Sequence, residues 1–334
     1  PYTTLFRSGL PLFDYLWAPW PKYFMVEDLV FNILGYIPLG FILAAALPQH
    51  WGKLRLIVGA TLLATLLSFS LETLQHYLPS RISSNIDLGA NATGALIGAT
   101  LAAPWGHALF ARHGGLSRWR TRFIIGGHTG DAGLILIGLW LLTQLTPDNL
   151  LFGSGDIRNL LGIAPPLPFK PERFIGFEAA LTASFLIAIG LFARCMMRET
   201  RHEPLIVLIL LGIGAKTLAA ASFFTPTDPW AWLTPGALRG LGIGLPLLTL
   251  SLLLPRVVQH ALAGTALLAA TALINLIPEN PYLNSGHSVI NRGNFLNFHG
   301  LTQLVASLWP FVALAYLSAL GLWRGEHLDG TRRI

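Results

Sequence analysis

Charged side chains are scarce in this 334-residue sequence. Asp, Glu, Lys and Arg make up 11% of it, whereas apolar residues make up 53%. A soluble domain does not cover its surface with so few charges. The single cysteine, Cys195, excludes an internal disulfide framework and most cysteine-based metal sites. An HExxH spacing is also missing, which disfavours metalloprotease chemistry. The composition therefore predicts an integral membrane protein, and we expect neither a metal nor another cofactor.

Long apolar runs, by contrast, fill nearly the whole chain. A helix needs about 20 mostly apolar residues to cross the hydrocarbon layer of a membrane. Nine segments meet this requirement, centred on residues 29–47, 55–76, 88–110, 124–146, 174–194, 204–224, 238–254, 257–277 and 299–323. The predicted fold class is all-α, a polytopic helical membrane protein with about nine transmembrane helices.

The first eight residues, PYTTLFRS, are what one reading frame of a widely used sequencing adapter encodes, and no Met precedes them. We expect residues 1–8 to be an assembly scar and leave them out of fold reasoning. On this interpretation the chain is truncated at its N-terminus. A first transmembrane helix would be missing, and residues 9–21 would be the loop that followed it.

Lys and Arg are distributed unequally between alternate loops. One set of loops holds 13: Lys53, Arg55, Arg112, Arg118, Arg120, Arg122, Arg194, Arg198, Arg201, Arg256, Arg324, Arg332 and Arg333. The other set holds 7: Lys22, Arg81, Arg158, Lys170, Arg173, Arg239 and Arg292. Short cytoplasmic loops carry the positive excess in membrane proteins. We therefore expect a cytoplasmic C-terminus and an outward-facing connection at residues 76–87, and we attribute the net charge of +6 to this asymmetry and not to nucleic-acid binding.

A polar stretch, ETLQHYLPSRISSNIDLGANATG, occupies residues 72–94 between two apolar segments. Spacings of three and four residues place its polar groups on one face of each helix. The groups that reach the outer edge of the bilayer are Asn32, Glu72, Gln75, His76, Arg81, Asp87 and Asn91. Ionisable groups there are costly without partners, so we expect Arg81 to neutralise Glu72 or Asp87. The cluster is either a functional site or a polar clasp that fixes the helical hairpin.

Four sequence features occur here in a specific order. Asn32 precedes YIPLGF at residues 36–41, SFSLETLQ spans residues 68–75, Arg81 follows, and NIDLGANATGALIG spans residues 85–98. In this order and spacing, residues 22–110 resemble the VanZ-like family, named for a membrane protein associated with teicoplanin resistance. The resemblance implies that the residues that matter are Asn32, Glu72, Gln75, Arg81, Asp87 and Asn91. It implies no settled reaction.

The resemblance includes longer family members that carry extra helices after this domain. We therefore expect five parts: an adapter scar at 1–8, a VanZ-like membrane domain without its first helix at 9–112, a basic cytoplasmic linker at 113–123, an additional transmembrane region at 124–324 and a cytoplasmic tail at 325–334.

The additional region contains two charges inside apolar segments. Glu178 lies about one turn from the outer end of its helix and Lys216 lies in the outer half of the next, at similar depth. An unpaired charge there is expensive, so we expect a structural ion pair between them. The stretch GIGAKT at residues 212–217 lies in an apolar helix and lacks a Gly directly before the Lys, so we do not expect nucleotide binding.

Small residues recur at four-residue spacing in two helices, at Ala90, Gly94 and Gly98 and again at 236, 240 and 244. Such stripes allow close helix packing, which is the role that we expect for both.

The segment at residues 278–300 is a second polar concentration, and it includes Arg292 and His299. It is either a solvated loop with a helix cap near Asn297 or the rim of an external groove that also contains Arg158.

Two classes of function are compatible with these features. The first is a factor of the bacterial cell envelope, in the inner membrane, that binds a lipid-linked cell-wall precursor or an anionic surface polymer and lowers susceptibility to teicoplanin; Arg81 would contact the anion. An enzymatic form would use Glu72 as general base, assisted by Asp87 or His76. The second is a transporter or flippase, with Glu178 and Lys216 along its path. In both cases membrane lipids are partners and nucleic acid is not.

Overall fold

The three-dimensional structure is a computed structural model, which describes residues 13–17, 19, 26–48, 50–77, 84–110, 114–146, 149–198, 201–223, 229–278 and 295–331. Within these ranges it contains helices and no β-strand, with one isolated bridge between Ile124 and Met197. The predicted all-α fold is therefore confirmed. The chain divides into two compact units, Pro1–Thr121 and Arg122–Ile334, which are described separately below.

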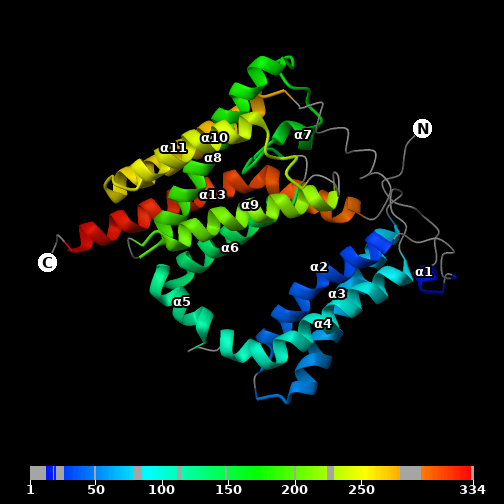
Figure 1. Ribbon diagram of the computed structural model, residues 1–334. Helices are drawn as coiled ribbons and strands as arrows, with labels where there is room; N and C mark the ends of the chain where they lie inside the picture. Colours follow the sequence, from blue (N-terminus) through cyan, green and yellow to red (C-terminus); the bar gives the residue numbers. More distant parts are fainter. Residues whose placement is uncertain are drawn as a thin grey trace. The chain divides into compact units, whose positions relative to one another are not determined.

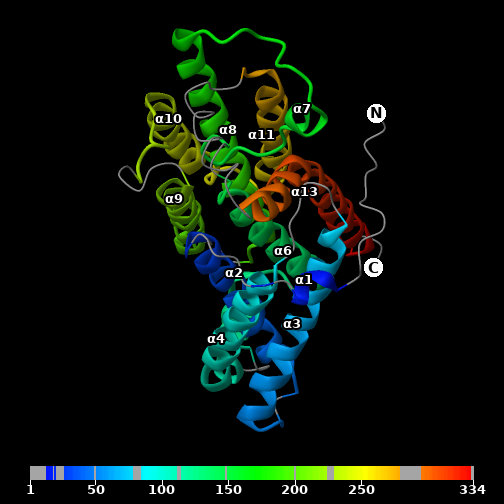
Figure 2. The ribbon, with the colours of Figure 1, turned by 90° about the vertical axis from the view of Figure 1, so that its right-hand side faces the viewer.

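Three long helices run side by side in the first unit (Figures 1 and 2). They are α2 (Val26–Ala46), α3 (Lys53–His76) and α4 (Asn85–Phe110), and a short helix, α1 (Asp14–Trp17), lies against α4. The segment expected to be a basic linker contains a further helix, α5 (Gly115–Phe123). Leu116, Trp119 and Phe123 recur there at helical spacing, which accounts for a helix where the charges alone indicated a linker.

Small residues bring α2 and α4 into close contact. A Cβ atom added at Gly94 would overlap the Ile33 carbonyl oxygen, and one added at Gly98 would overlap that of Ile37. Ala90 in the same stripe is buried as well. The stripe predicted from the sequence is thus a packing surface, as expected for helices that associate within a membrane.

The second unit is built around α8 (Pro171–Met196), whose side chains are mostly buried from Phe174 onward. Its other helices are α6 (Gly127–Thr143), α7 (Ile157–Leu161), α9 (Glu203–Phe223), α10 (Pro235–Ser251), α11 (Arg256–Leu276) and α13 (Phe295–Thr331). Helices α10 and α11 pack along α8, and α13 packs against α6 (Figures 1 and 2). The second predicted stripe also packs, because a Cβ atom at Gly240 would lie 2.5 Å from the Thr182 Cβ atom of α8.

Seven of the helices are long and apolar enough to cross a membrane: α2, α3, α4, α8, α9, α11 and α13. All nine segments predicted from the sequence contain helix, but α6 and α10 are only 17 residues long. Since about 20 residues span the hydrocarbon layer, these two are shorter than expected. The protein is a multi-pass helical membrane protein.

Three connections with excess Arg meet at one end of the second unit. The Arg256 guanidinium donates to the carbonyl oxygens of Met197 and Arg198 at 3.0 and 2.7 Å. The Arg198 backbone N–H donates to the Phe123 carbonyl oxygen at 2.9 Å. The distribution of Lys and Arg predicts that these connections lie on one side of the membrane, and they do lie together. That this side is cytoplasmic stays a prediction.

Candidate functional site

Polar side chains of α2, α3 and α4 gather at one end of the first unit. We call Asn32, Tyr36, Ser68, Glu72, Asp87 and Asn91 the polar cluster. Asn32 of α2 donates from Nδ2 to Asp87 Oδ1 of α4 at 2.8 Å. This bond joins two helices that also touch through their glycines, and it gives the Asp87 carboxylate a donor where only 7% of the residue is exposed. A buried carboxylate requires such donors.

A second link joins α4 to α3. Asn91 donates from Nδ2 to the Ser68 hydroxyl oxygen at 2.9 Å, and Ser68 is fully buried. The Tyr36 hydroxyl of α2 lies beside the same Ser68 side chain and near Glu72. Asn91 is 5% exposed, yet its Oδ1 atom has no hydrogen-bond partner. The cluster therefore presents one unused acceptor in a buried position.

The cluster is confined to one end of the bundle. The buried polar or charged residues that the structure describes in the first unit are Ser68, Glu72, Asp87 and Asn91. The buried residues farther along the three helices are small and apolar: Ala44, Ala60, Ala64, Ala95, Ala99 and Ala102. The two carboxylates, two amides and two hydroxyls of the polar cluster can bind hydroxyl or ammonium groups that approach this end of the bundle. The cluster does not extend to the other end.

Helix α1 covers part of this end. The Tyr15 hydroxyl lies 2.9 Å from Thr73 Oγ1, and the Tyr15 ring lies 5.4 Å from the His76 ring. Tyr15 is only 3% exposed. Asn85 Nδ2 donates to the Leu16 carbonyl oxygen at 3.5 Å. Aromatic side chains with a polar tip thus border the cluster beside Glu72, which lies one turn before His76.

The geometry agrees with a comparison of the sequence with known families. Residues 4–109 match the family model described as VanZ/LLP1. This part of the chain is VanZ-like. The 334 residues of the chain extend well beyond the matched region, which we call the VanZ-like region. No curated protein and no solved structure matches the chain significantly.

Sequence reasoning identified four members of the polar cluster in the VanZ-like region and missed two. Asn32 bonds to Asp87, Asn91 bonds to Ser68, and Glu72 lies one turn beyond Ser68 on α3; that they form a functional site stays a prediction. Tyr36 and Ser68 were not singled out, although both lie in the motifs that carried the resemblance. A spacing of four residues from Ala60 through Ala64 and Ser68 to Glu72 marks one buried face of α3, and it could have indicated Ser68.

Several predicted residues lie outside what the structure describes. These are Arg81 and Arg292, together with the side chains of Gln75 and His299. The expected pairing of Arg81 with Glu72 or Asp87 stays a prediction, and so does the external rim at residues 278–300. Over the described residues, no group of three or more His, Cys, Asp or Glu side chains could hold a metal ion.

The predicted ion pair between Glu178 and Lys216 is not formed. The Lys216 ammonium donates to the carbonyl oxygen of Thr146 at 2.9 Å and also to that of Asn149. Glu178 instead faces the start of α10, where it lies beside Thr234 and packs on Gly236. The two residues were predicted to lie at similar depth in the membrane, but their side chains do not face each other. Carbonyl groups stabilise Lys216, and a hydroxyl at a helix N-terminus stabilises Glu178.

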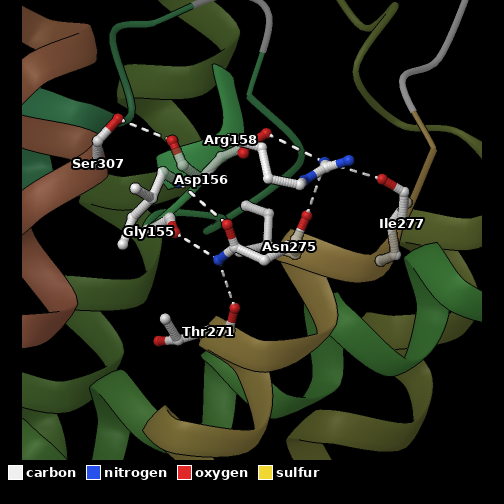
Figure 3. A network of polar contacts seen from close by, with 9 residues as sticks. Gly155, Asp156, Arg158, Thr271, Asn275, Ile277 and Ser307 are labelled. Carbon is white, nitrogen blue, oxygen red and sulfur yellow. Dashed lines mark hydrogen bonds and ion pairs between the residues drawn. The ribbon is translucent and has the colours of Figure 1, made fainter. Parts of the chain in front are cut away.

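The second unit has a polar network where residues 155–158 meet α11 and α13 (Figure 3). Asn275 of α11 donates to the Gly155 carbonyl oxygen at 2.7 Å and accepts from the Ile157 N–H at 3.1 Å. Ser307 of α13 donates to the Asp156 carbonyl oxygen at 2.9 Å. Figure 3 also shows Arg158 directed at the end of α11, with bonds of 3.1 and 2.9 Å to the Ile274 and Ile277 carbonyl oxygens. Arg158 thus binds the C-terminal end of a helix, where carbonyl groups favour a cation.

Proposed function

We propose that the VanZ-like region binds a lipid-linked or anionic surface molecule of the bacterial cell envelope through the polar cluster, and that it thereby lowers susceptibility to teicoplanin-type glycopeptides. The observation that carries the proposal is that the buried polar and charged residues described in the first unit, Ser68, Glu72, Asp87 and Asn91, lie at one end of α3 and α4 beside Asn32 of α2. Ionisable groups at membrane depth that face the bundle interior mark functional sites by default.

The chemistry divides between the described cluster and Arg81. Glu72 and Asp87, with Asn32 and Asn91, accept and donate hydrogen bonds that orient hydroxyl, amide or ammonium groups of a bound molecule. Arg81 would contact a phosphate or carboxylate. The unused Asn91 Oδ1 atom adds an acceptor for a ligand donor. The VanZ family is associated with teicoplanin resistance, and this link supplies the expected phenotype.

Antibiotic susceptibility of a sensitive host tests the proposal. The host expresses the wild-type chain, Glu72→Gln, Arg81→Ala or the control Thr93→Val at matched membrane abundance. Thr93 is exposed on α4 and bonds only within its own helix, at 2.8 Å from its hydroxyl to the Gly89 carbonyl oxygen. We expect protection against teicoplanin but not vancomycin, retained in Thr93→Val and lost in the other two variants. A folded wild-type protein without protection contradicts the proposal.

The same variants separate a binding site from a polar clasp. Glu72→Gln keeps the shape of the side chain and its hydrogen-bonding capacity while removing the charge. If protection is lost while the melting temperature is unchanged, Glu72 acts on a ligand. If both fall together, the cluster acts as a clasp between α3 and its neighbours.

A transporter or flippase is the second candidate, and one feature of the second unit favours it. Residues 144–146 and 149–156 are non-helical and largely buried, and Lys216 donates to the Thr146 and Asn149 carbonyl groups. Interrupted helical structure beside a buried charge is typical of transporter binding sites. Uptake of a labelled envelope lipid into proteoliposomes tests this function; transport that is lost in Lys216→Met would favour it over one-sided binding.

A further inference from the structure

Residues 149–156, which precede α7, form a largely buried loop. Leu151, Phe152 and Ser154 are at most 2% exposed, and Phe152 adopts a φ of 63°. The Gln144 side chain accepts from the Phe152 N–H at 3.1 Å, and the Gly155 N–H donates to the Ala306 carbonyl oxygen at 2.7 Å. These two hydrogen bonds tie the loop to the end of α6 and to α13.

A small pocket lies between this loop, the end of α11 and α13. Its polar lining consists of Asn149, Ser154, Gly155, Asp156, Gln303 and Ser307. The free space is about that of one water molecule or one hydroxyl group. The pocket adjoins the network of Figure 3, in which Ser307 and Asp156 are labelled.

Two buried hydrogen-bond donors on the pocket wall have no partner. Ser154 is 1% exposed, and its Oγ atom makes no hydrogen bond. The Asn149 Nδ2 atom is buried and likewise makes none. More than about nine in ten buried polar groups in folded proteins are hydrogen-bonded. A polar group bound in this pocket would satisfy both donors.

We propose that this pocket binds a hydroxyl group of a polyol. Asn149 Nδ2 and Ser154 Oγ would donate to the hydroxyl oxygen, and the hydroxyl proton would go to the Asp156 carboxylate. Asp156 lies 3.5 Å from Arg158 Nη2, its side chain is 24% exposed, and it would repel a phosphate or carboxylate oxygen. An ammonium group could not accept from Asn149. A hydroxyl group can accept hydrogen bonds from Asn149 and Ser154 through its oxygen and can donate its proton to Asp156.

Two sources supply such a group: the glycerol head of phosphatidylglycerol or a free saccharide. Native mass spectrometry of the full chain in mild detergent compares retention of phosphatidylglycerol with that of phosphatidylethanol, which has the same phosphodiester charge but no hydroxyl group. We expect the protein to retain about three- to tenfold more phosphatidylglycerol than phosphatidylethanol, because phosphatidylethanol has no hydroxyl group to form these uncharged hydrogen bonds. A thermal shift with free glucose and none with phosphatidylglycerol would assign the pocket to a saccharide.

Ser154→Ala and Asn149→Leu should each bring the retention ratio to about one. The control Ser318→Ala removes an exposed hydroxyl from α13 that bonds only within its helix, and it should keep the wild-type ratio. Without lipid, Ser154→Ala should melt at or above the wild-type temperature, since it removes a buried, unpaired hydroxyl.

Three results would overturn the proposal. One is equal retention of the two lipids by the wild-type chain without a glucose shift, which would mean that the pocket holds water only. The second is a lipid preference that both pocket variants retain. The third is a lower melting temperature of lipid-free Ser154→Ala, which would assign its hydroxyl to the fold. Each concerns the second unit, so each leaves the function proposed for the VanZ-like region untouched.

Discussion

At the scale of single residues, side chains from different helices hold the polar cluster together in pairs. The Asn32–Asp87 bond is the clearest case, because the donor and the carboxylate come from α2 and α4. Removing the partner of a buried charged group leaves the cost of its desolvation uncompensated.

Asn32→Leu tests this bond. The change leaves Asp87 short of one donor, so we expect the free energy of unfolding to fall by about 1–3 kcal/mol, measured by thermal or denaturant unfolding in detergent micelles. Asn32→Asp should be worse, because it places a second carboxylate against the first. Thr93→Val is the matched control and should change stability by less than about 0.5 kcal/mol. A wild-type melting curve for Asn32→Leu would show that the bond contributes nothing.

Glu178 and Lys216 are a second case. Because the two side chains contact different residues, substitutions at the two positions should change stability independently. Lys216→Met leaves the Thr146 and Asn149 carbonyl groups without their donor, and we expect a loss of about 2–5 kcal/mol. Glu178→Gln should cost less, because an amide still reaches Thr234. In the double variant the two losses should add to within about 0.5 kcal/mol.

A smaller loss in the double variant than the sum would reveal coupling between the two residues, contrary to their separate environments. Arg239→Met provides the control for removing a cation, because Arg239 is exposed on α10. It should leave the melting temperature close to that of the wild type.

At the scale of elements, the distance between α2 and α4 depends on glycine. Gly98→Ala places a Cβ atom on the Ile37 carbonyl oxygen, which cannot move without moving α2. We expect the free energy of unfolding to fall by about 1–3 kcal/mol, the usual effect of overpacking.

Gly89→Ala in the same helix should have the opposite sign. Nothing lies within 4 Å of a Cβ atom there. Ala is favoured over Gly in a helix interior by about 1 kcal/mol, so this variant should be more stable than the wild type. Thermal unfolding of both variants side by side provides the measurement. Equal effects of the two substitutions would show that helix propensity, and not close packing, governs α4.

At the scale of the whole molecule, the distribution of Arg predicts the orientation in the membrane. The only cysteine, Cys195, is buried, so a Cys195→Ala background allows single cysteines to be introduced and labelled. Leu253 is 80% exposed in the connection between α10 and α11, and Ile163 is 55% exposed beyond α7. A membrane-impermeant maleimide should label Ile163→Cys in spheroplasts and Leu253→Cys only after lysis. The reverse pattern would refute the cytoplasmic assignment of the C-terminus.

Long apolar runs made the helices predictable, because each contains its own backbone hydrogen bonds. The stripes at Gly94, Gly98 and Gly240 were predictable for a similar reason: close packing needs small residues at helical spacing. The partners of Glu178 and Lys216 were not predictable. Depth in the membrane follows from counting residues, whereas the direction in which a helix faces depends on its neighbours.

The sequence by itself determined the membrane class, the positions of the helices and the gathering of Asn32, Glu72, Asp87 and Asn91 at one depth, since these follow from hydropathy and from a fixed rise per residue. Only the tertiary structure decided which side chains bond to one another. It brought Tyr36 and Ser68 into the polar cluster, separated Glu178 from Lys216 and folded residues 149–156 into a largely buried loop. Those outcomes depend on how helices rotate and pack together, which local spacing does not specify.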